Sequence, residues 1–180
     1  MDKFDIQYRP NYDPHSVQYM RDELTAVGFS ECLTLDDIDR ALLKSTDETV
    51  LLVINSVCGC AAGSARPGVA MALQHRVIPD RLVTVFAGME KKTVEYLRQR
   101  FLSDFLPSSP LFAIFRSGQA EFVMQRKDIV NKSPEEIAGL LTTVFDRMCS
   151  KAGPSISPEE FSKLENIAMC SSNIPKYQGS

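Results

Sequence analysis

The chain has 180 residues, of which 44% are hydrophobic and 24% charged, and its formal net charge is −3. A chain of this length buries roughly 70% of the surface that its unfolded form exposes, so we expect one globular domain with a substantial core. The acidic pI of about 5.4 provides no electrostatic attraction for nucleic acid or for an anionic membrane, so neither is an expected partner.

The N-terminus and the cysteines indicate the compartment. Three of residues 1–5 are charged and no apolar run follows them, so no signal peptide is predicted. No apolar run approaches the roughly 20 residues that cross a bilayer. The five cysteines are an odd number, which in a chain without an export signal favours a reducing compartment over a disulfide framework. The sequence therefore predicts a cytoplasmic protein.

In the first half of the chain, helices alternate with strands. Asp13 followed by Pro14 predicts the start of the first helix. The run 50–54 has no polar alternation, which is typical of a central strand buried on both faces. Pro67 falls inside the third helix and should kink it. The expected helices run over 14–27, from the cap at 34 to 45–47, and from the cysteines after residue 57 to about 75; the expected strands cover 29–33, 50–54 and 82–86.

The second half predicts a helix, a hairpin and a final helix. Ser117 and Gly118 indicate the turn of an antiparallel hairpin. Ser133 and Glu136 form a capping box at the start of the clearest amphipathic helix in the chain. The expected elements are a charged helix over 90–101, whose residues 90–92 and 98–100 form a solvated face, strands over 111–115 and 121–124, and a helix over 134–148.

The composition changes after this helix. Residues 151–155 are expected to be a linker, followed by a short helix that is capped at Ser157 and extends to Ala168. We therefore expect one domain over 1–150 and a C-terminal extension over 151–180, whose last ten residues fray. The order of strands and helices predicts an α/β fold with a mixed sheet and helices on both faces.

The chemistry-bearing residues of the chain follow the predicted central strand. Cys58 and Cys60 arrive one residue apart at the start of the next helix. The first N–H groups of a helix have no partner within it and the helix dipole is positive there, so a thiolate is stabilised and becomes reactive at neutral pH. Gly59 keeps the turn compact and permits the unusual dihedral angles that a bridge between its neighbours requires.

These residues carry a resemblance to a known family. The element order, with cysteines at the head of a helix and a Ser-Pro pair before the hairpin, resembles the thioredoxin fold. The string Asn-Ser-Val-Cys-Gly-Cys-Ala-Ala-Gly over 55–63, followed by Ala-Arg-Pro over 65–67, is similar to the bacilliredoxin family. Met-Arg-Asp-Glu-Leu-Thr over 20–25 and Ser-Ser-Pro over 108–110 fit the same family. The resemblance covers residues 14–149.

The resemblance implies a function and a site. Bacilliredoxins remove the low-molecular-weight thiol bacillithiol from mixed disulfides with proteins, with no bound cofactor and the small thiol as co-substrate. Carried over, Cys58 attacks and takes the small thiol, and Cys60 or free thiol releases it. Gly59, Ser109 and Pro110 would contact the substrate, with a cis peptide bond before Pro110. The implied partners are proteins that carry such mixed disulfides and a small-thiol disulfide reductase that recycles the thiol.

Two departures from ordinary thioredoxins narrow this function. Thioredoxins carry a buried acid six positions before the first cysteine, where this chain has Leu52. Protons would therefore reach Cys60 through water or the backbone, which favours small-thiol removal over general protein reduction. A disulfide between Cys58 and Cys60 would be strained by the short spacing, so a more oxidising couple than thioredoxin is expected.

Other readings of the cysteine pair remain open. One is a weak disulfide isomerase or general reductase. Another is a non-enzymatic adaptor or a metal-binding module, although structural zinc needs about four ligands and the sequence has no second cluster of Cys and His, so no metal site is predicted. Gly63 and Gly68 lack the Lys-Ser/Thr of a phosphate loop. For Arg66 we expect a structural or surface role, with binding of a small-thiol carboxylate as the alternative.

The remaining cysteines and the histidines are expected outside the site. Cys32 is predicted in the core. Cys149 is predicted in the core or as a surface thiol, with a third redox cysteine as the alternative. Cys170 lies in the tail, beyond the resemblance, with a regulatory or intermolecular disulfide as the less favoured alternative. Both His15 and His75 are expected at the surface.

Overall fold

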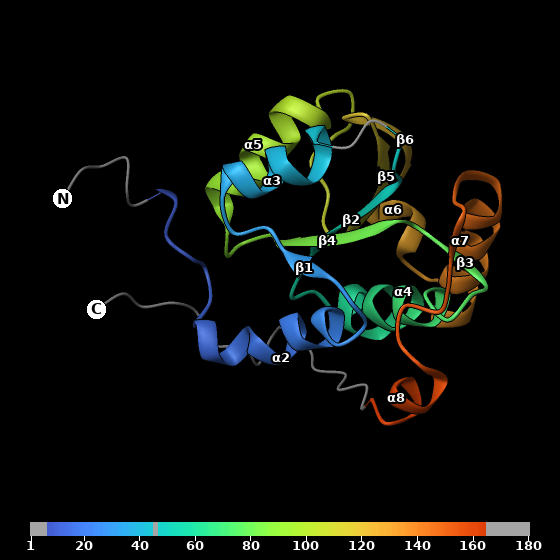
Figure 1. The fold of residues 1–180 in the computed structure, drawn as a ribbon. Coiled ribbons are helices and arrows are strands. Elements are labelled where there is room, and N and C mark those ends of the chain that lie inside the picture. Colours follow the sequence, from blue (N-terminus) through green and yellow to red (C-terminus); the bar gives the residue numbers. More distant parts are fainter. Residues whose placement is uncertain (1–6, 45–46, 165–180) are drawn as a thin grey trace.

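The computed structural model describes residues 7–44 and 47–164, and it has a mixed five-stranded sheet between two layers of helices (Figure 1). The strands lie in the order β1 (Ser30–Glu31), β4 (Arg81–Phe86), β2 (Val50–Asn55), β5 (Leu111–Arg116) and β6 (Gln119–Met124). The first three are mutually parallel, and β5 and β6 are antiparallel to their neighbours. The predicted thioredoxin-like α/β fold is confirmed.

The helices divide between the two faces of the sheet. Helices α3 (Leu35–Leu43) and α5 (Lys91–Phe101) cover one face; α2 (Pro14–Thr25), α4 (Arg66–Ala72) and α7 (Pro134–Met148) cover the other (Figure 1). All six residues of β2 are buried, with Leu51 and Val53 in one hydrophobic core and Leu52 and Ile54 in the other. The prediction of a central strand buried on both faces is therefore confirmed.

Local capping sets the helix starts that the sequence predicts. The Asp13 carboxylate accepts the backbone N–H of Ser16 at 2.9 Å and so caps α2. Reciprocal capping boxes begin α3 at Thr34 and α7 at Ser133. Each cap supplies a partner to backbone N–H groups that the helix leaves unpaired. Helix α3 ends at Leu43, and the predicted end at 45–47 falls partly outside the described residues.

The helix after the cysteines differs from a single kinked α-helix. A π-helical turn, η1 (Ala61–Ala65), precedes α4, and the N–H of Arg66 bonds to the carbonyl of Ala61. Pro67 therefore lies in the first turn of α4, where its missing N–H leaves no bond unmade. At Gly68 an added Cβ would lie 2.6 Å from Ile137. Glycine at this position lets α4 pack closely against α7.

The hairpin has the predicted turn. Ser117 and Gly118 both have positive φ, 51° and 75°, and join β5 to β6 with Arg116 paired to Gln119. Positive φ at both turn residues matches the right-handed twist of the strands. A short helix that the sequence did not predict, α6 (Arg126–Ile129), follows β6 and is capped by reciprocal bonds between Gln125 and Asp128.

The expected linker at 151–155 is wrong. Residues in this stretch form β7 (Lys151–Ala152), which pairs antiparallel with β3 (Val77–Ile78). The backbone approaches so closely that a Cβ on Gly153 would lie 2.0 Å from the carbonyl oxygen of His75. The pairing of β7 with β3 holds this stretch against the domain, and the lack of a side chain at Gly153 makes the close approach possible.

The predicted C-terminal helix is present but short. Helix α8 (Pro158–Ser162) begins at a capping box between Ser157 and Glu160. Phe161 and Leu164 pack against the core on the α4 and α7 side. The remainder of the prediction, up to Ala168 and the frayed tail, lies outside the described residues. Within the described part of the chain, no helix is long and apolar enough to cross a membrane.

Candidate active site

The two cysteines lie at the carboxyl end of the central strand. Cys58 and Cys60 come just after Asn55, the last residue of β2. Because Ile54 of β2 pairs with Leu111 of β5, the residue before Leu111 lies beside the end of β2. That residue is Pro110, and the Ser109–Pro110 peptide bond is cis, as the resemblance implied. The sheet register therefore brings the thiols and the cis-proline loop to the same edge.

Hydrogen bonds around Cys58 favour its thiolate. The side chain is half-buried and burial by itself raises the pKa of the thiol. Hydrogen bonds with Cys60 and Ser56, and from the N–H of Ala61 at 3.4 Å, outweigh burial and leave the pKa of Cys58 below its ordinary value. The positive charge of Arg126 acts in the same direction. These donors stabilise the negative sulfur and not the neutral thiol.

Cys60 has the opposite shift. Burial, its hydrogen bond to Cys58 and the nearby negative charge of that thiolate raise the pKa of Cys60. At neutral pH the pair thus consists of one thiol with increased thiolate character and one that keeps its proton. Since the thiolate is the attacking form, the asymmetry makes Cys58 the better nucleophile of the two.

A polar network holds the turn from beneath. The side-chain amide of Asn55 donates to the carbonyl of Met20 on α2 at 2.9 Å, and its oxygen accepts the N–H of Ser56 at 2.8 Å. The guanidinium of Arg66 donates to the Asn55 oxygen at 3.2 Å and to the Ser56 carbonyl at 2.9 Å. The backbone that leads to Cys58 is therefore fixed by α2 on one side and α4 on the other.

Arg66 is one of the most deeply buried side chains of the protein. Only 1% of its side chain is exposed, and its Nε donates to Glu23 of α2 at 2.6 Å. Burial raises the pKa of Glu23, while the charge and hydrogen bond of Arg66 oppose that change. Nη2 of Arg66, Oε1 of Glu23 and the hydroxyl of Tyr19 are buried and have no hydrogen-bond partner among the residues that the structure describes. The structure places Arg66 in the interior, so its role is structural and it does not face a substrate.

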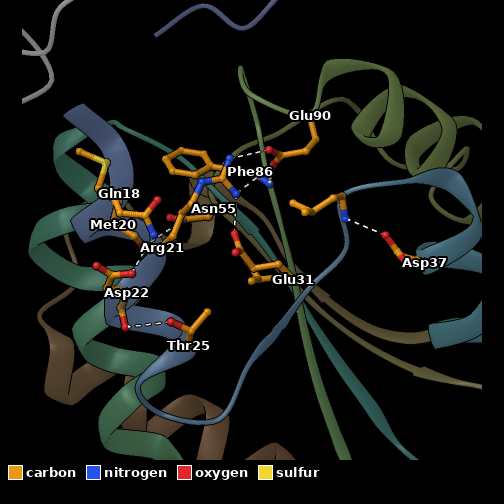
Figure 2. Close-up of polar contacts among 12 residues, drawn as sticks. Gln18, Met20, Arg21, Asp22, Thr25, Glu31, Asp37, Asn55, Phe86 and Glu90 are labelled. Carbon is orange, nitrogen blue, oxygen red and sulfur yellow. Dashed lines mark hydrogen bonds and ion pairs between the residues drawn. The ribbon is translucent and has the colours of Figure 1, made fainter. Parts of the chain in front are cut away.

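A second arginine, Arg21 of α2, anchors this helix to the sheet (Figure 2). Arg21 forms ion pairs with Glu31, at the end of β1, and with Glu90, just before α5, and it stacks over the ring of Phe86. Glu90 also accepts the N–H of Phe86 at 3.0 Å. The expected solvated face over 90–92 is thus wrong at Glu90, because the carboxylate faces this buried arginine.

Other predicted residues lie as follows. Leu52 is fully buried in the core, so no carboxylate stands at that position of β2. Gly59 is exposed, and its φ is not positive. A Cβ at this position would meet nothing within 4 Å. With Cys58 and Cys60 both free, as in this structure, no steric reason requires glycine here. Cys32 is buried in the core, as predicted, and Cys149 is half-buried. His75 bonds to Asp146 at 3.0 Å.

Within residues 7–44 and 47–164, no three or more His, Cys, Asp or Glu side chains cluster in a way that could hold a metal ion. Cys170 falls outside that range.

Three residues of the site were not found from the sequence. Ser56 belongs to the family string over 55–63, but nothing in that string marks its hydroxyl as a contact of the nucleophile. Glu23 and Arg126 come from distant segments, and nothing in their local sequence indicates that they lie near the cysteine turn. Their placement follows from helix packing and the sheet register, which are long-range contacts.

Comparison with known proteins agrees with this geometry. A family model described as disulphide isomerase matches residues 12–149. A bacilliredoxin of Salinibacter ruber is 45% identical over 148 residues, which cover 82% of this chain and 86% of the relative. Bacilliredoxins of Koribacter versatilis and Staphylococcus aureus are 42% and 38% identical, over 72% and 75% of this chain and 88% and 91% of the relatives. With its cysteine pair at the end of the central strand of a thioredoxin-like sheet, the chain belongs to the bacilliredoxin family.

Proposed function

We propose that the protein is a thiol–disulfide oxidoreductase that removes a low-molecular-weight thiol, of the bacillithiol type, from mixed disulfides with proteins. The observation that carries this proposal is the opposite shift of two adjacent thiols. Cys58 has a lowered pKa and Cys60 a raised one, on a half-buried turn beside a cis-proline loop. Such a pair has one thiol ready to attack and a second held in reserve.

The exchange proceeds through a mixed disulfide on the enzyme. The Cys58 thiolate attacks the small thiol's sulfur; the new bond forms as the protein–thiol bond breaks, and the client cysteine leaves as a thiolate that takes a proton from water. Cys60, after loss of its proton, then attacks the Cys58 sulfur, forms the Cys58–Cys60 disulfide and releases the small thiol. Alternatively, a second molecule of the small thiol attacks the enzyme adduct, which yields the small-thiol disulfide and free Cys58.

The surroundings of the pair suit this chemistry. With Leu52 buried in the core, β2 offers no acid at that position to move a proton to or from Cys60. Exposed Gly59 leaves the approach to the sulfurs open. Ser109 and Pro110, at the same edge of the sheet, would contact the disulfide that is being exchanged. The proposed partners are proteins with mixed disulfides and a small-thiol disulfide reductase, in a reducing compartment such as the cytoplasm.

A second candidate is disulfide isomerisation. The description of the matching family model, disulphide isomerase, favours it. An isomerase must attack disulfides within a client protein, and another client thiol must then release the client before Cys60 attacks the Cys58 sulfur, a step that would leave the client reduced and Cys58–Cys60 oxidised. The two functions share the Cys58 nucleophile and differ in whether the sulfur that receives the attack belongs to a small molecule or to a protein.

The test uses a reporter protein with a single cysteine, which is joined by a disulfide either to bacillithiol or to glutathione. Each of the two adducts is incubated with the wild type, with Cys58→Ala and with Cys60→Ala. Intact mass should show release of the reporter thiol by the wild type and one small-thiol adduct on Cys60→Ala. Cys58→Ala should remove nothing. Removal of the small thiol by Cys58→Ala would disprove the assigned nucleophile.

The alternatives give different results. If the protein reshuffles the bonds of a scrambled disulfide protein faster than it removes the small thiol, the result would favour the isomerase. Purification with stoichiometric zinc or copper, lost on replacing either cysteine, together with no transfer from any adduct, would favour the metal-binding module.

A further inference from the structure

A positively charged groove lies beside the cis-proline loop. It has a volume of about 580 Å³ and is lined by Arg98, Pro107, Ser108, Ser109, Arg126, Lys127 and Val130. All three charged residues in this lining are cations and none is a carboxylate. In a chain with 23 Asp and Glu against 20 Lys and Arg, a groove of one positive sign is contrary to the overall composition and points to an anionic ligand.

The walls of the groove are fixed by bonds that leave its outer cations unused. Arg98 donates through Nη2 to the carbonyl of Ser108 at 3.0 Å, and its Nε is buried with no partner within residues 7–44 and 47–164. The hydroxyl of Ser108 accepts the backbone N–H of Arg126 at 2.9 Å. The side chains of Arg126 and Lys127 are exposed, and neither forms an ion pair with a carboxylate of the described residues. The expected solvated role of Arg98 is therefore wrong, since this residue braces the loop.

The groove is next to the reacting sulfurs. The charge of Arg126 acts on both Cys58 and Cys60. Ser109, which also lines the groove, precedes the cis bond to Pro110 at the end of β2. A molecule whose sulfur is joined to Cys58 can thus place its other groups against Arg126 and Lys127.

We propose that this groove binds carboxylate groups of the small thiol while its sulfur is exchanged at Cys58. The proposal rests on the proposed function and specifies its substrate class as a thiol that carries carboxylates. The groove has the size of a small-molecule site and not of an extended protein interface. Arg126 and Lys127 hold the anion, and Arg98 holds the loop in place from behind.

The test compares small thiols of different charge on one reporter protein. Mixed disulfides of a single-cysteine reporter with mercaptosuccinate, which has two carboxylates, and with 2-mercaptoethanol, which is neutral, are offered to Cys60→Ala under single-turnover conditions. Each rate is divided by the rate of the same adduct with dithiothreitol, which corrects for the intrinsic reactivity of the disulfide. We expect a charge preference, the ratio of the two corrected rates, of about tenfold at low salt, which falls as salt rises.

The variants locate that preference. The Arg126→Gln/Lys127→Gln double variant, in the Cys60→Ala background, should reduce the ratio to about one. Arg126→Gln also raises the Cys58 pKa, but that change slows both adducts alike and cancels in the ratio. Lys92→Gln is the matched control, because it removes one exposed charge from α5 outside the groove, and it should leave the ratio unchanged.

Each other outcome overturns the inference or the function beneath it. A ratio that the double variant leaves unchanged disproves the groove as the anion site. The same is true if the preference follows acidic residues placed beside the reporter cysteine and not the charge of the small thiol, since the occupant is then the client protein. Absence of transfer from any adduct disproves the proposed function itself.

Discussion

The chain twice places a cysteine between a strand and the helix that follows it. The pKa values of these two thiols are shifted in opposite directions. Cys32 comes directly after β1 and before α3, and Cys58 comes after β2 and before η1. Burial, followed by the nearby negative charge of Asp37, raises the pKa of Cys32 to about 12. The pKa of Cys58 is lowered. Proximity to the start of a helix therefore does not by itself make a cysteine reactive.

The difference comes from what surrounds each sulfur. Cys32 continues the sheet ladder by donating its N–H to the carbonyl of Thr84 at 2.7 Å, and its side chain packs in the core with Ile38. Cys58 lies on an irregular turn, where its sulfur accepts the N–H of Ala61 and is influenced by the positive charge of Arg126. Donors and positive charge at the sulfur determine the thiolate, and burial without them suppresses it.

The largest contrast is expected from exchanging each sulfur for oxygen. Cys58→Ser should reduce small-thiol removal to the background rate, because a serine hydroxyl stays protonated at neutral pH. Cys32→Ser should keep the activity but lose about 1–3 kcal/mol in the free energy of unfolding, since a hydroxyl is buried among apolar side chains. Single-turnover assays and urea unfolding measure the two effects. Loss of activity in a folded Cys32→Ser protein would contradict the assignment.

The support beneath the Cys58 turn gives the next effect. Arg66→Met should lower the free energy of unfolding by about 3–5 kcal/mol, because Glu23 keeps a buried charge with no partner. The turn also loses the hydrogen bond from Arg66 to the Ser56 carbonyl. We therefore expect the pKa of Cys58 to rise, which is the direction of the shift at Cys32. Urea unfolding and thiolate absorbance against pH report the two changes.

A double variant separates charge burial from lost packing. Glu23→Gln/Arg66→Met should be more stable than Arg66→Met, since it removes the unpaired carboxylate. Equal stability of the two would show that Glu23 carries no charge in the single variant.

The opposite pKa shifts should appear in the pH dependence of stability. The native state holds the Cys32 proton more tightly than the unfolded state, so this contribution is present below about pH 9 and is lost as pH rises toward 12. Between pH 9 and 11 the wild type should therefore lose stability more steeply than Cys32→Ala, by up to about 1.4 kcal/mol per pH unit. The folded protein releases the Cys58 proton more readily than the unfolded chain does. As pH rises toward about 9, the wild type should therefore gain stability relative to Cys58→Ala.

The smallest effect tests a single donor at the nucleophile. Ser56→Ala should raise the pKa of Cys58 by up to about one unit, the equivalent of one hydrogen bond. The rate of alkylation by iodoacetamide across pH measures it. Ser64→Ala is the matched control, since that hydroxyl bonds to the carbonyl of Lys132 and not to a sulfur. The same pKa change in both variants would refute a direct role for Ser56.

The sequence by itself determined the features that depend on neighbouring residues. The caps at Asp13, Thr34 and Ser133 fixed where helices begin, and the apolar run of β2 fixed the central strand. The cysteine string identified the family, which the comparisons confirmed. Each of these signals lies within a few residues, where local hydrogen bonds and apolar spacing decide the outcome.

Only the tertiary structure decided the environment of the thiols. It buried Arg66 against Glu23, placed residues 151–152 of the expected linker in β7, and brought Arg126 near the cysteine turn. It also gave Cys58 and Cys32 opposite pKa shifts, although both follow a strand and precede a helix in the sequence. Electrostatic shifts depend on burial and on charges from distant parts of the chain, so the reactivity of a cysteine follows from packing and not from its position beside a helix.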